Sequence, residues 1–420
     1  MRILSLTENF PPETNAAATR VYERACYWAD WGHEVTVVTT APNFPQGKLY
    51  EGYENRWYQT EWIDGIRVVR VKSIIAPNRG TFRRLLDFLS FLFTGFAGGI
   101  LQNRPDVVTA TSPQFFSALA GWLLGVVRRV PFVFELGDIW PASILAVGAM
   151  KPNLALRFME KLELFLYNQS AAIVALTFAF KRNLVKRGIS GDKVAVVMNG
   201  VELSKYFPRP CNAGLAQEWG IADSFVIGYI GTHGMAHRLH NVLDAADRLK
   251  SEQRVRFLFV GDGAERSDLI AYARERHMEN VIFRPSEPKE RMPEVWSLCD
   301  VALVHLRNSP VFSEVVPSKI FEAMAMKIPI LLAAPAGEAS EILAREGAGL
   351  KIAAEDPDAL AAAVIELAND SDLRKRLGAA GHCSAAKYTR VRQAEEMLQV
   401  LEIAAAGWGD RAGVGHNALC

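Results

Sequence analysis

The sequence predicts an α/β protein built from two doubly wound domains. Short β-branched runs alternate with longer amphipathic segments, and this alternation breaks and restarts near residue 200. Such alternation is typical of parallel sheets covered by helices. The length of 420 residues also exceeds what one hydrophobic core usually organises.

The first expected domain covers residues 1–200 and starts directly with a strand. Its expected strands are Arg2–Thr7, Glu34–Thr40, Ile66–Val71, Asp106–Ala110, Pro131–Glu135, Ala171–Leu176 and Lys193–Met198. Its clearest helical segments are Ala16–Trp31, Pro113–Arg128 and Leu154–Asn168.

The second expected domain covers residues 201–387, after a turn at Asn199-Gly200 and two prolines at positions 208 and 210 that resist regular structure. Its expected strands are Phe225–Gly231, Arg254–Val260, Val281–Phe283, Asp300–His305 and Ile328–Ala333. Its expected helices are Asn241–Lys250, Ala264–His277, Lys289–Leu298 and Ser318–Met326.

Charge and cysteine usage exclude several classes of protein. Lys and Arg number 47 against 46 Asp and Glu, so no basic excess favours nucleic acid. The five cysteines are scattered without a CxxC pair, which indicates a reducing compartment and no structural zinc. The apolar run at the N-terminus is too short for the core of a signal peptide, so we expect a cytoplasmic protein.

The most informative segment is Pro317-Ser318-Lys319, which precedes an apolar-periodic run. Pro317 disfavours helix before it and Ser318 is a good N-cap, so we expect a helix to start here. Free N–H groups in the first turn and the helix dipole would then form an anion site suited to a diphosphate. The donors expected are those of Lys319, Ile320 and Phe321. The positive charge of Lys319 at a helix start also indicates a bound anion.

Two glutamates frame this segment. Glu322 follows one turn into the helix, where its carboxylate can accept hydrogen bonds from the vicinal hydroxyls of a ribose, and Glu314 lies eight residues earlier. The pair resembles the E-x7-E pattern of retaining GT-B glycosyltransferases of the family-4 type. Chance spacing with a solvated Lys319 is the alternative.

Other motifs resemble the same family. Phe259–Arg266 contains Gly261 and Gly263, which resemble its turn beside the nucleotide. Val197–Glu202 resembles its hinge, with the motif at Asn199-Gly200-Val201-Glu202. The loop that starts at Gly231 departs from the family pattern, because Thr232 replaces an expected Arg. We therefore expect Arg238 and Lys319 to neutralise the diphosphate.

On the acceptor side, the loop after the first strand offers Thr14, Asn15 and Arg20, with a plain helix cap as the alternative. The segments Ala41–Tyr53 and Phe134–Pro141 resemble a narrower branch, that of N-acetylfucosaminyltransferases of O-antigen and capsule assembly. This resemblance implies that Asp138 lies at the cleft floor and orients or deprotonates the acceptor hydroxyl. The alternative is an Asp that caps the next helix.

The resemblance implies a GT-B fold of two Rossmann-like domains around an interdomain cleft, with acceptor bound by the first domain and donor by the second. It also implies that a helix over 388–406 packs back on the first domain. The expected reaction is retaining transfer by front-face displacement, catalysed by Asp138, Glu314, Arg238 and Lys319.

The expected donor is a UDP-linked N-acetylated amino or deoxyamino hexose, and the expected acceptor is a lipid-linked glycan of a surface polysaccharide. No cofactor besides the nucleotide sugar and no metal is expected, because no DxD-type carboxylate pair occurs in a loop expected at the cleft. A sugar-nucleotide epimerase and a non-catalytic sugar-nucleotide-binding subunit remain alternatives.

Residues 79–101 form an unusual segment in which Arg79, Arg83 and Arg84 precede the apolar run 85–101. Three interpretations stay open. The segment docks on an anionic membrane surface, it is a buried core helix, or it spans a bilayer, although it is slightly short for the last. The first would place the protein on the inner face of the cytoplasmic membrane.

Overall fold

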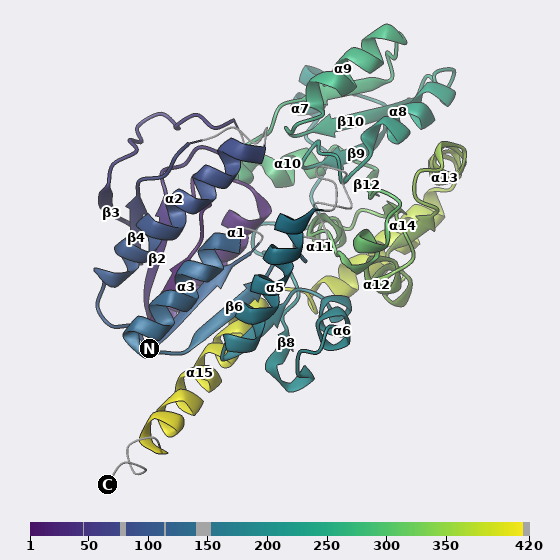
Figure 1. Cartoon of the computed structure of the whole chain (residues 1–420). Coiled ribbons are helices and arrows are strands. Elements are labelled where there is room, and N and C mark those ends of the chain that lie inside the picture. The colour runs from purple at the N-terminus through teal and green to yellow at the C-terminus, as the bar shows by residue number, and fades with distance from the viewer. Residues whose placement is uncertain (45, 76–80, 113–114, 140–152, 415–420) are drawn as a thin grey trace. The chain divides into compact units, whose positions relative to one another are not determined.

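The computed structural model describes residues 1–44, 46–75, 81–112, 115–139 and 153–414 (Figure 1). The chain divides into two compact units. Unit 1 comprises Met1–Met198 and Arg390–Cys420, and unit 2 comprises Asn199–Thr389. The divisions lie close to the boundaries expected at residues 200 and 387.

Unit 1 is organised around an eight-stranded sheet of order β3-β4-β2-β1-β5-β6-β7-β8, parallel except for the antiparallel pair β3 and β4. Its strands are β1 (Arg2–Leu6), β2 (Glu34–Thr40), β3 (Tyr58–Ile63), β4 (Ile66–Val71), β5 (Val107–Thr111), β6 (Phe132–Leu136), β7 (Ala172–Ala175) and β8 (Val194–Val196). Its helices are α1 (Ala16–Asp30), α2 (Thr81–Ile100), α3 (Phe115–Arg128), α5 (Leu154–Gln169), α6 (Phe178–Lys186), the 3-10 turn η1 (Gly191–Lys193) and α15 (Arg390–Val414).

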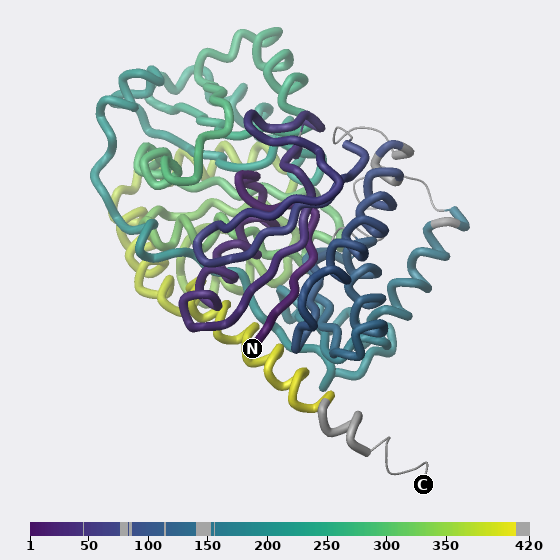
Figure 2. Tube along the Cα trace, turned by 90° about the vertical axis from the view of Figure 1, so that its left-hand side faces the viewer, coloured from purple at the N-terminus to yellow at the C-terminus, as the bar shows by residue number. Residues whose placement is uncertain are grey.

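Helices cover both faces of this sheet, because successive strand residues point to opposite sides. On one face, Val37 and Val107 pack with Trp28 of α1 and Met397 of α15. On the other face, Gly98 of α2 lies against strand valines and Gly121 of α3 lies against Ala110 and Phe132. Figures 1 and 2 show α2, α3 and α5 together on this second face and α15 on the first.

The last helix therefore belongs to the first unit. Trp28 Nε1 donates to the carbonyl oxygen of Ala394 at 3.0 Å, and Arg390 forms an ion pair with Glu23 at 2.7 Å. All four groups are buried. Helix α15 thus completes the core that covers the α1 side of the sheet.

Helix α2 accounts for most of the predicted membrane segment. Phe91 and Leu92 are buried in the core of unit 1, whereas Phe93 is 70% exposed. The helix is thus part core and part surface, and Arg79 lies outside the described residues. Among the described helices, none is both long and apolar enough to cross a bilayer.

Unit 2 contains a six-stranded, fully parallel sheet of order β11-β10-β9-β12-β13-β14. Its strands are β9 (Phe225–Ile230), β10 (Val255–Val260), β11 (Val281–Arg284), β12 (Val301–His305), β13 (Ile330–Ala333) and β14 (Gly349–Ile352). Its helices and 3-10 turns are α7 (Ala213–Trp219), α8 (Leu239–Arg248), α9 (Arg266–Glu275), η2 (Lys289–Arg291), α10 (Met292–Trp296), η3 (Pro310–Glu314), α11 (Lys319–Ala325), α12 (Glu338–Glu346), α13 (Pro357–Asn369) and α14 (Ser371–Ala385).

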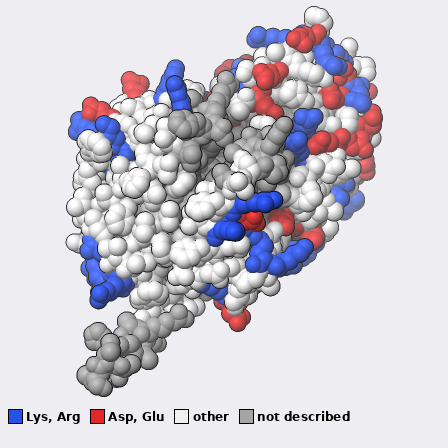
Figure 3. Space-filling view, viewed as in Figure 1, with Lys and Arg blue, Asp and Glu red and all other residues white. Residues whose placement is uncertain are grey.

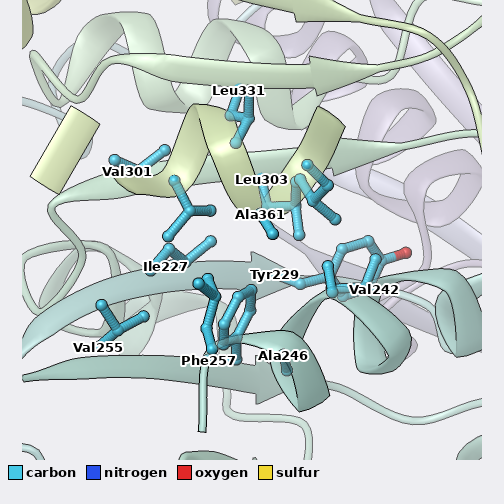
Figure 4. Close-up of a cluster of buried hydrophobic side chains, with 14 of the residues drawn as sticks. Ile227, Tyr229, Val242, Ala246, Val255, Phe257, Val301, Leu303, Leu331 and Ala361 are labelled. Atoms are coloured by element: carbon cyan, nitrogen blue, oxygen red, sulfur yellow. The ribbon is translucent and has the colours of Figure 1, made fainter. Parts of the chain in front are cut away.

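The central strands of unit 2 meet helices α8, α9 and α13 in one apolar core (Figure 4). Ile227, Phe257 and Leu303 point from the sheet toward Val242 of α8 and Ala361 of α13. Burial of such side chains is the main stabilising contribution in a domain of this size. The carboxyl ends of the strands are thereby held on a rigid base.

Candidate functional site

The strand order of unit 2 defines a switch point between β9 and β12. From β9 the chain proceeds through β10 to β11 on one side, and β12 to β14 extend on the other. Ligands of open α/β sheets bind outside the carboxyl ends of the strands at such a point. The loops after β9 and β12 are tied together here. His237 Nδ1 lies 3.2 Å from the carbonyl oxygen of His305, and the Arg307 amide donates to the Ala236 carbonyl oxygen at 2.8 Å.

Lys319, the first residue of α11, places its ammonium group beside this point. Nζ lies 3.9 Å from the ring centroid of Tyr229. It also lies 3.0 Å from the place that a Cβ atom on Gly231 would occupy. Nζ is buried and has no hydrogen-bond partner in the part of the chain that the structure describes. Burial lowers the pKa of Lys319 to about 7, and the nearby Glu322 only partly opposes this shift.

Two neutral histidines lie close to Lys319 and leave its charge without a counter-ion. His233 is fully buried, and neither ring nitrogen has a partner among the described residues. Burial, with Lys319 as the next cause, lowers the pKa of His233 to about 4 and that of His237 to about 3. Arg266 acts on His233 in the same direction, and Asp262 opposes it. A buried, unpaired cation costs free energy, which an anionic ligand would recover.

The start of α11, which was predicted to bind a diphosphate, lacks the expected N-cap and most of the expected free N–H groups. Ser318 has a helical backbone conformation and makes no side-chain cap. The N–H of Ile320 donates to the Pro317 carbonyl oxygen at 3.1 Å, and that of Phe321 to the Ser318 carbonyl oxygen at 3.0 Å. The prediction of three free N–H groups was therefore wrong for two of them. A tight first turn uses these donors internally. The charge available to an anion at this place is that of the Lys319 side chain.

The two glutamates lie on different elements. Glu322 is one turn into α11, where its Oε2 accepts a hydrogen bond of 3.0 Å from Trp296 Nε1 at the end of α10. Glu314 is the last residue of η3. The indole of Trp296 holds the Glu322 carboxylate in one orientation, as a group that binds hydroxyls requires.

Arg238 does not join Lys319 in the buried group. Its side chain is about half exposed, and its Nε lies 3.9 Å from Glu355. Its backbone is left-handed at φ 46°. The expectation that it neutralises a diphosphate remains a prediction.

The glycines predicted beside the nucleotide serve a structural purpose. A Cβ atom on Gly261 would lie 2.0 Å from the Gly231 carbonyl oxygen, and one on Gly263 would lie 2.4 Å from the His233 carbonyl oxygen. Gly231, Gly261 and Gly263 also have φ between 136° and 157°, which side-chain-bearing residues rarely adopt. These glycines let the loops after β9 and β10 pack directly on each other, which places the backbone of His233 against Gly263.

On unit 1, the predicted acceptor residues have mixed environments. Asn15 caps α1 by accepting a hydrogen bond from the Ala18 amide at 3.0 Å, and Thr14 is exposed. The structure therefore places Asn15 in the cap named as the alternative. Arg20 is buried and donates to Glu135 Oε1 at 2.8 Å.

Glu135, at the end of β6, organises a buried ionic group that the sequence analysis did not identify. Arg24 contacts both of its oxygens, at 2.9 and 2.6 Å, and the Thr111 hydroxyl donates at 2.6 Å. Burial opposes ionisation of Glu135, but Arg24 and Arg20 outweigh it and hold the pKa of this carboxyl far below its usual range.

The second terminal nitrogen of Arg20 lies next to the residues that follow β6. Arg20 Nη2 has no partner among the described residues and lies 3.1 Å from where a Cβ atom on Gly137 would stand. Asp138 follows Gly137 directly. The structure thus brings Arg20 and the backbone that carries Asp138 together, although they are far apart in sequence.

Tyr229, His233, Trp296 and Glu135 were all missed as site residues from the sequence. His233 is fully buried, which the polar sequence of its loop did not indicate. Only Glu135 had a detectable signal, as a charged residue in an otherwise apolar strand. Within the described residues, no group of three or more His, Cys, Asp or Glu side chains could hold a metal ion.

Two Rossmann-like units with parallel sheets have the architecture of GT-B glycosyltransferases, and family matches assign the chain to that class. Residues 15–200 match the glycosyl transferase 4-like domain, and residues 215–382 match the family of glycosyl transferases group 1. The chain belongs to these glycosyltransferases and is a hexosyltransferase.

Relatives and solved structures agree with this assignment. The chain is 26% identical to WcaI of Escherichia coli (strain K12), named as a colanic acid biosynthesis glycosyl transferase, over 78% of this chain and 81% of WcaI. Sucrose-phosphate synthase from Thermosynechococcus elongatus superposes with a TM-score of 0.77 at 16% identity, over 97% and 99% of the two chains. HepE of Anabaena, solved with UDP and glucose, gives a TM-score of 0.72 at 19% identity over 96% and 99%. The two structural similarities concern the fold alone.

Proposed function

We propose that the enzyme transfers an N-acetylated amino or deoxyamino hexose from UDP to a lipid-linked glycan, with retention at the anomeric carbon. Unit 2 binds the donor and unit 1 binds the acceptor. The membrane that carries the acceptor is the proposed place of action. WcaI, a relative named for colanic acid biosynthesis, supports surface polysaccharide assembly as the pathway class.

The observation that carries the donor assignment is the buried, unpartnered ammonium group of Lys319 at the switch point. A diphosphate placed here would supply the missing negative charge. Glu322, oriented by Trp296, would then accept hydrogen bonds from the ribose hydroxyls one turn further along α11. HepE, which has the same fold and was solved with UDP, supports the choice of nucleotide.

In the proposed reaction, the bond between the anomeric carbon and the diphosphate oxygen breaks, and its electron pair stays on the diphosphate. The acceptor oxygen forms a bond to the same face of that carbon. Its proton goes to Asp138, or to the departing diphosphate if Asp138 only orients the hydroxyl. Lys319 stabilises the charge that develops on the leaving group. Arg238 and Glu314 keep their predicted roles beside the diphosphate and the sugar.

A thermal-shift screen of nucleotides and nucleotide sugars tests the donor site. UDP and UDP-sugars should raise the melting temperature of the wild type, since a ligand that binds only the native state stabilises it. Glu322→Ala should abolish the shift, and Glu341→Ala, on the exposed side of α12, should not. If UDP stabilises Glu322→Ala as much as the wild type, the ribose assignment is wrong.

Metal independence is part of this proposal, because Lys319 can neutralise the leaving group. Transfer measured with EDTA present should equal transfer without it. Loss of activity in EDTA that magnesium restores would contradict this part and leave the donor assignment intact.

A further inference from the structure

Three neighbouring helices of unit 1 carry apolar side chains on their outer surfaces. Helix α3 packs against both α2 and α5, and Trp122 of α3 contacts Phe165 of α5 with ring centroids 5.2 Å apart. We define the outer face as the solvent-facing surface of α2, α3 and α5. Figure 3 shows this side of unit 1 as a broad, mostly uncharged surface with charged side chains, both basic and acidic, at its margins.

Helix α5 shows the pattern most clearly. At 100° per residue, Leu154, Phe158, Lys161 and Phe165 fall within about 60° of one another around the helix. Leu154 is 81% exposed and Phe158 is 64% exposed. A large apolar side chain in this position contributes nothing to the core, so its exposure requires another explanation.

The acidic residues of α5 point elsewhere. Glu160 lies about 130° around the helix from the centre of this apolar stripe. Arg187, next to the end of α6, binds Glu160 at 3.6 Å and the buried Glu163 at 2.7 Å. The basic residues Arg157 and Lys161, in contrast, are exposed close to the stripe.

Helices α2 and α3 continue the apolar surface. On α2, Leu86, Leu89, Phe93, Ala97 and Ile100 fall within about 80° of one another, and all are at least partly exposed. On α3, an equivalent stripe contains no charged residue and ends at Val126, which is 56% exposed. Its members are Leu119, Trp122, Leu123 and Val126.

Cations gather where α2 and α3 end. Arg128 donates to the Gln102 carbonyl oxygen at 2.8 Å, and Arg104 donates to the carbonyl oxygens of Arg128 and Arg129 at 3.1 Å each. Arg83 is exposed near the start of α2. The apolar outer face is thus accompanied by basic groups on all three helices.

We propose that the outer face of α2, α3 and α5 docks on an anionic lipid surface, with the aromatic side chains in the interface and the basic groups on the headgroups. Exposed apolar helices bordered by cations have the chemistry of elements that lie in a membrane interface. A second copy of the chain would bring cations against cations, so charge favours lipid. This proposal rests on the proposed function, because a lipid-linked acceptor lies at the same surface.

Flotation with vesicles of phosphatidylglycerol or phosphatidylcholine tests the proposal. The wild type should bind phosphatidylglycerol vesicles. The triple variant F93S/V126S/F158S should bind both kinds of vesicle at least about tenfold more weakly. The double variant R157E/K161E should lose binding to phosphatidylglycerol only. Ile403→Ser is the matched control, because Ile403 is 72% exposed but lies on α15, on the other face of the sheet.

Melting temperatures and UDP binding of every variant separate this proposal from the proposed function. All substituted residues are exposed, so both properties should stay unchanged; if the triple variant unfolds, Phe158→Ser alone gives the same comparison. Vesicle binding that survives these substitutions, or a wild type that binds neither vesicle, would overturn the docking surface. So would a wild-type dimer that the triple variant converts to a monomer without any vesicle binding. A wild type that binds vesicles but not UDP would contradict the donor assignment instead.

Discussion

Replacement of Lys319 by Met should stabilise the ligand-free enzyme and abolish donor binding. Met has nearly the length of Lys but carries no charge to desolvate. The pKa of Lys319 falls from 10.5 to about 7 in the folded protein. At about 1.36 kcal/mol per pH unit, this difference corresponds to a cost of about 4 to 5 kcal/mol when Lys319 is protonated.

The pH dependence fixes the sign of this effect. The unfolded chain binds the proton of Lys319 more tightly than the native state does, so wild-type stability should rise with pH between about 7 and 10.5. The advantage of Lys319→Met should therefore be complete below pH 7 and vanish above pH 10.5. Urea denaturation of both proteins at pH 6 and pH 9 measures it.

Isothermal titration calorimetry with UDP supplies the second half of the test. Lys319→Met should show no detectable binding, whereas Lys351→Met, at an exposed lysine of β14, should match the wild type in both assays. The reasoning is refuted if Lys319→Met is no more stable than the wild type at pH 6, or if it binds UDP normally.

Three further predictions concern the donor site around Lys319 and the buried ionic group around Glu135. UDP binding at pH 8 should take up about 0.9 proton per enzyme, because Lys319 with a pKa of about 7 is mostly neutral beforehand; titration in buffers of different ionisation heat measures this. Trp296→Phe should weaken UDP binding several-fold, since Glu322 loses its 3.0 Å hydrogen bond, and should also lower stability, since the smaller ring leaves a cavity at a fully buried position; equal affinity in the variant would contradict a positioning role. Glu135→Gln should cost about 3 to 5 kcal/mol at pH 7, and the cost should shrink progressively below pH 4.5, because the unfolded chain then takes up a proton while the folded carboxyl stays ionised until its depressed pKa is reached; urea denaturation at pH 7 and pH 3 checks the decrease.

The sequence predicted the fold well because buried parallel strands form continuous apolar runs. The edge strand β3 was missed, since its side chains alternate between exposed and partly buried and it pairs antiparallel with β4. The Asp64-Gly65 turn that joins these strands was a usable hairpin signal. Strand β14 was missed because it is short and begins with Gly349.

The candidate site was predictable only in part. The position of Lys319 near a helix start followed from Pro317, but the internal hydrogen bonds of the first turn did not. The pairing of Arg20 with Glu135 joins residues 115 positions apart, so no local pattern contains it. For α2, periodicity alone could not tell that Phe91 faces the core and Phe93 faces solvent.

The return of α15 to unit 1 sets an order on biosynthesis. While the ribosome makes residues 199–389, the core on the α1 side of the first sheet is incomplete, because Met397 and Leu401 do not yet exist. Unit 2 can therefore fold before the core of unit 1 is complete. A nascent chain halted before Arg390 would expose an apolar surface to chaperones and proteases, even if the sheet of unit 2 had already formed.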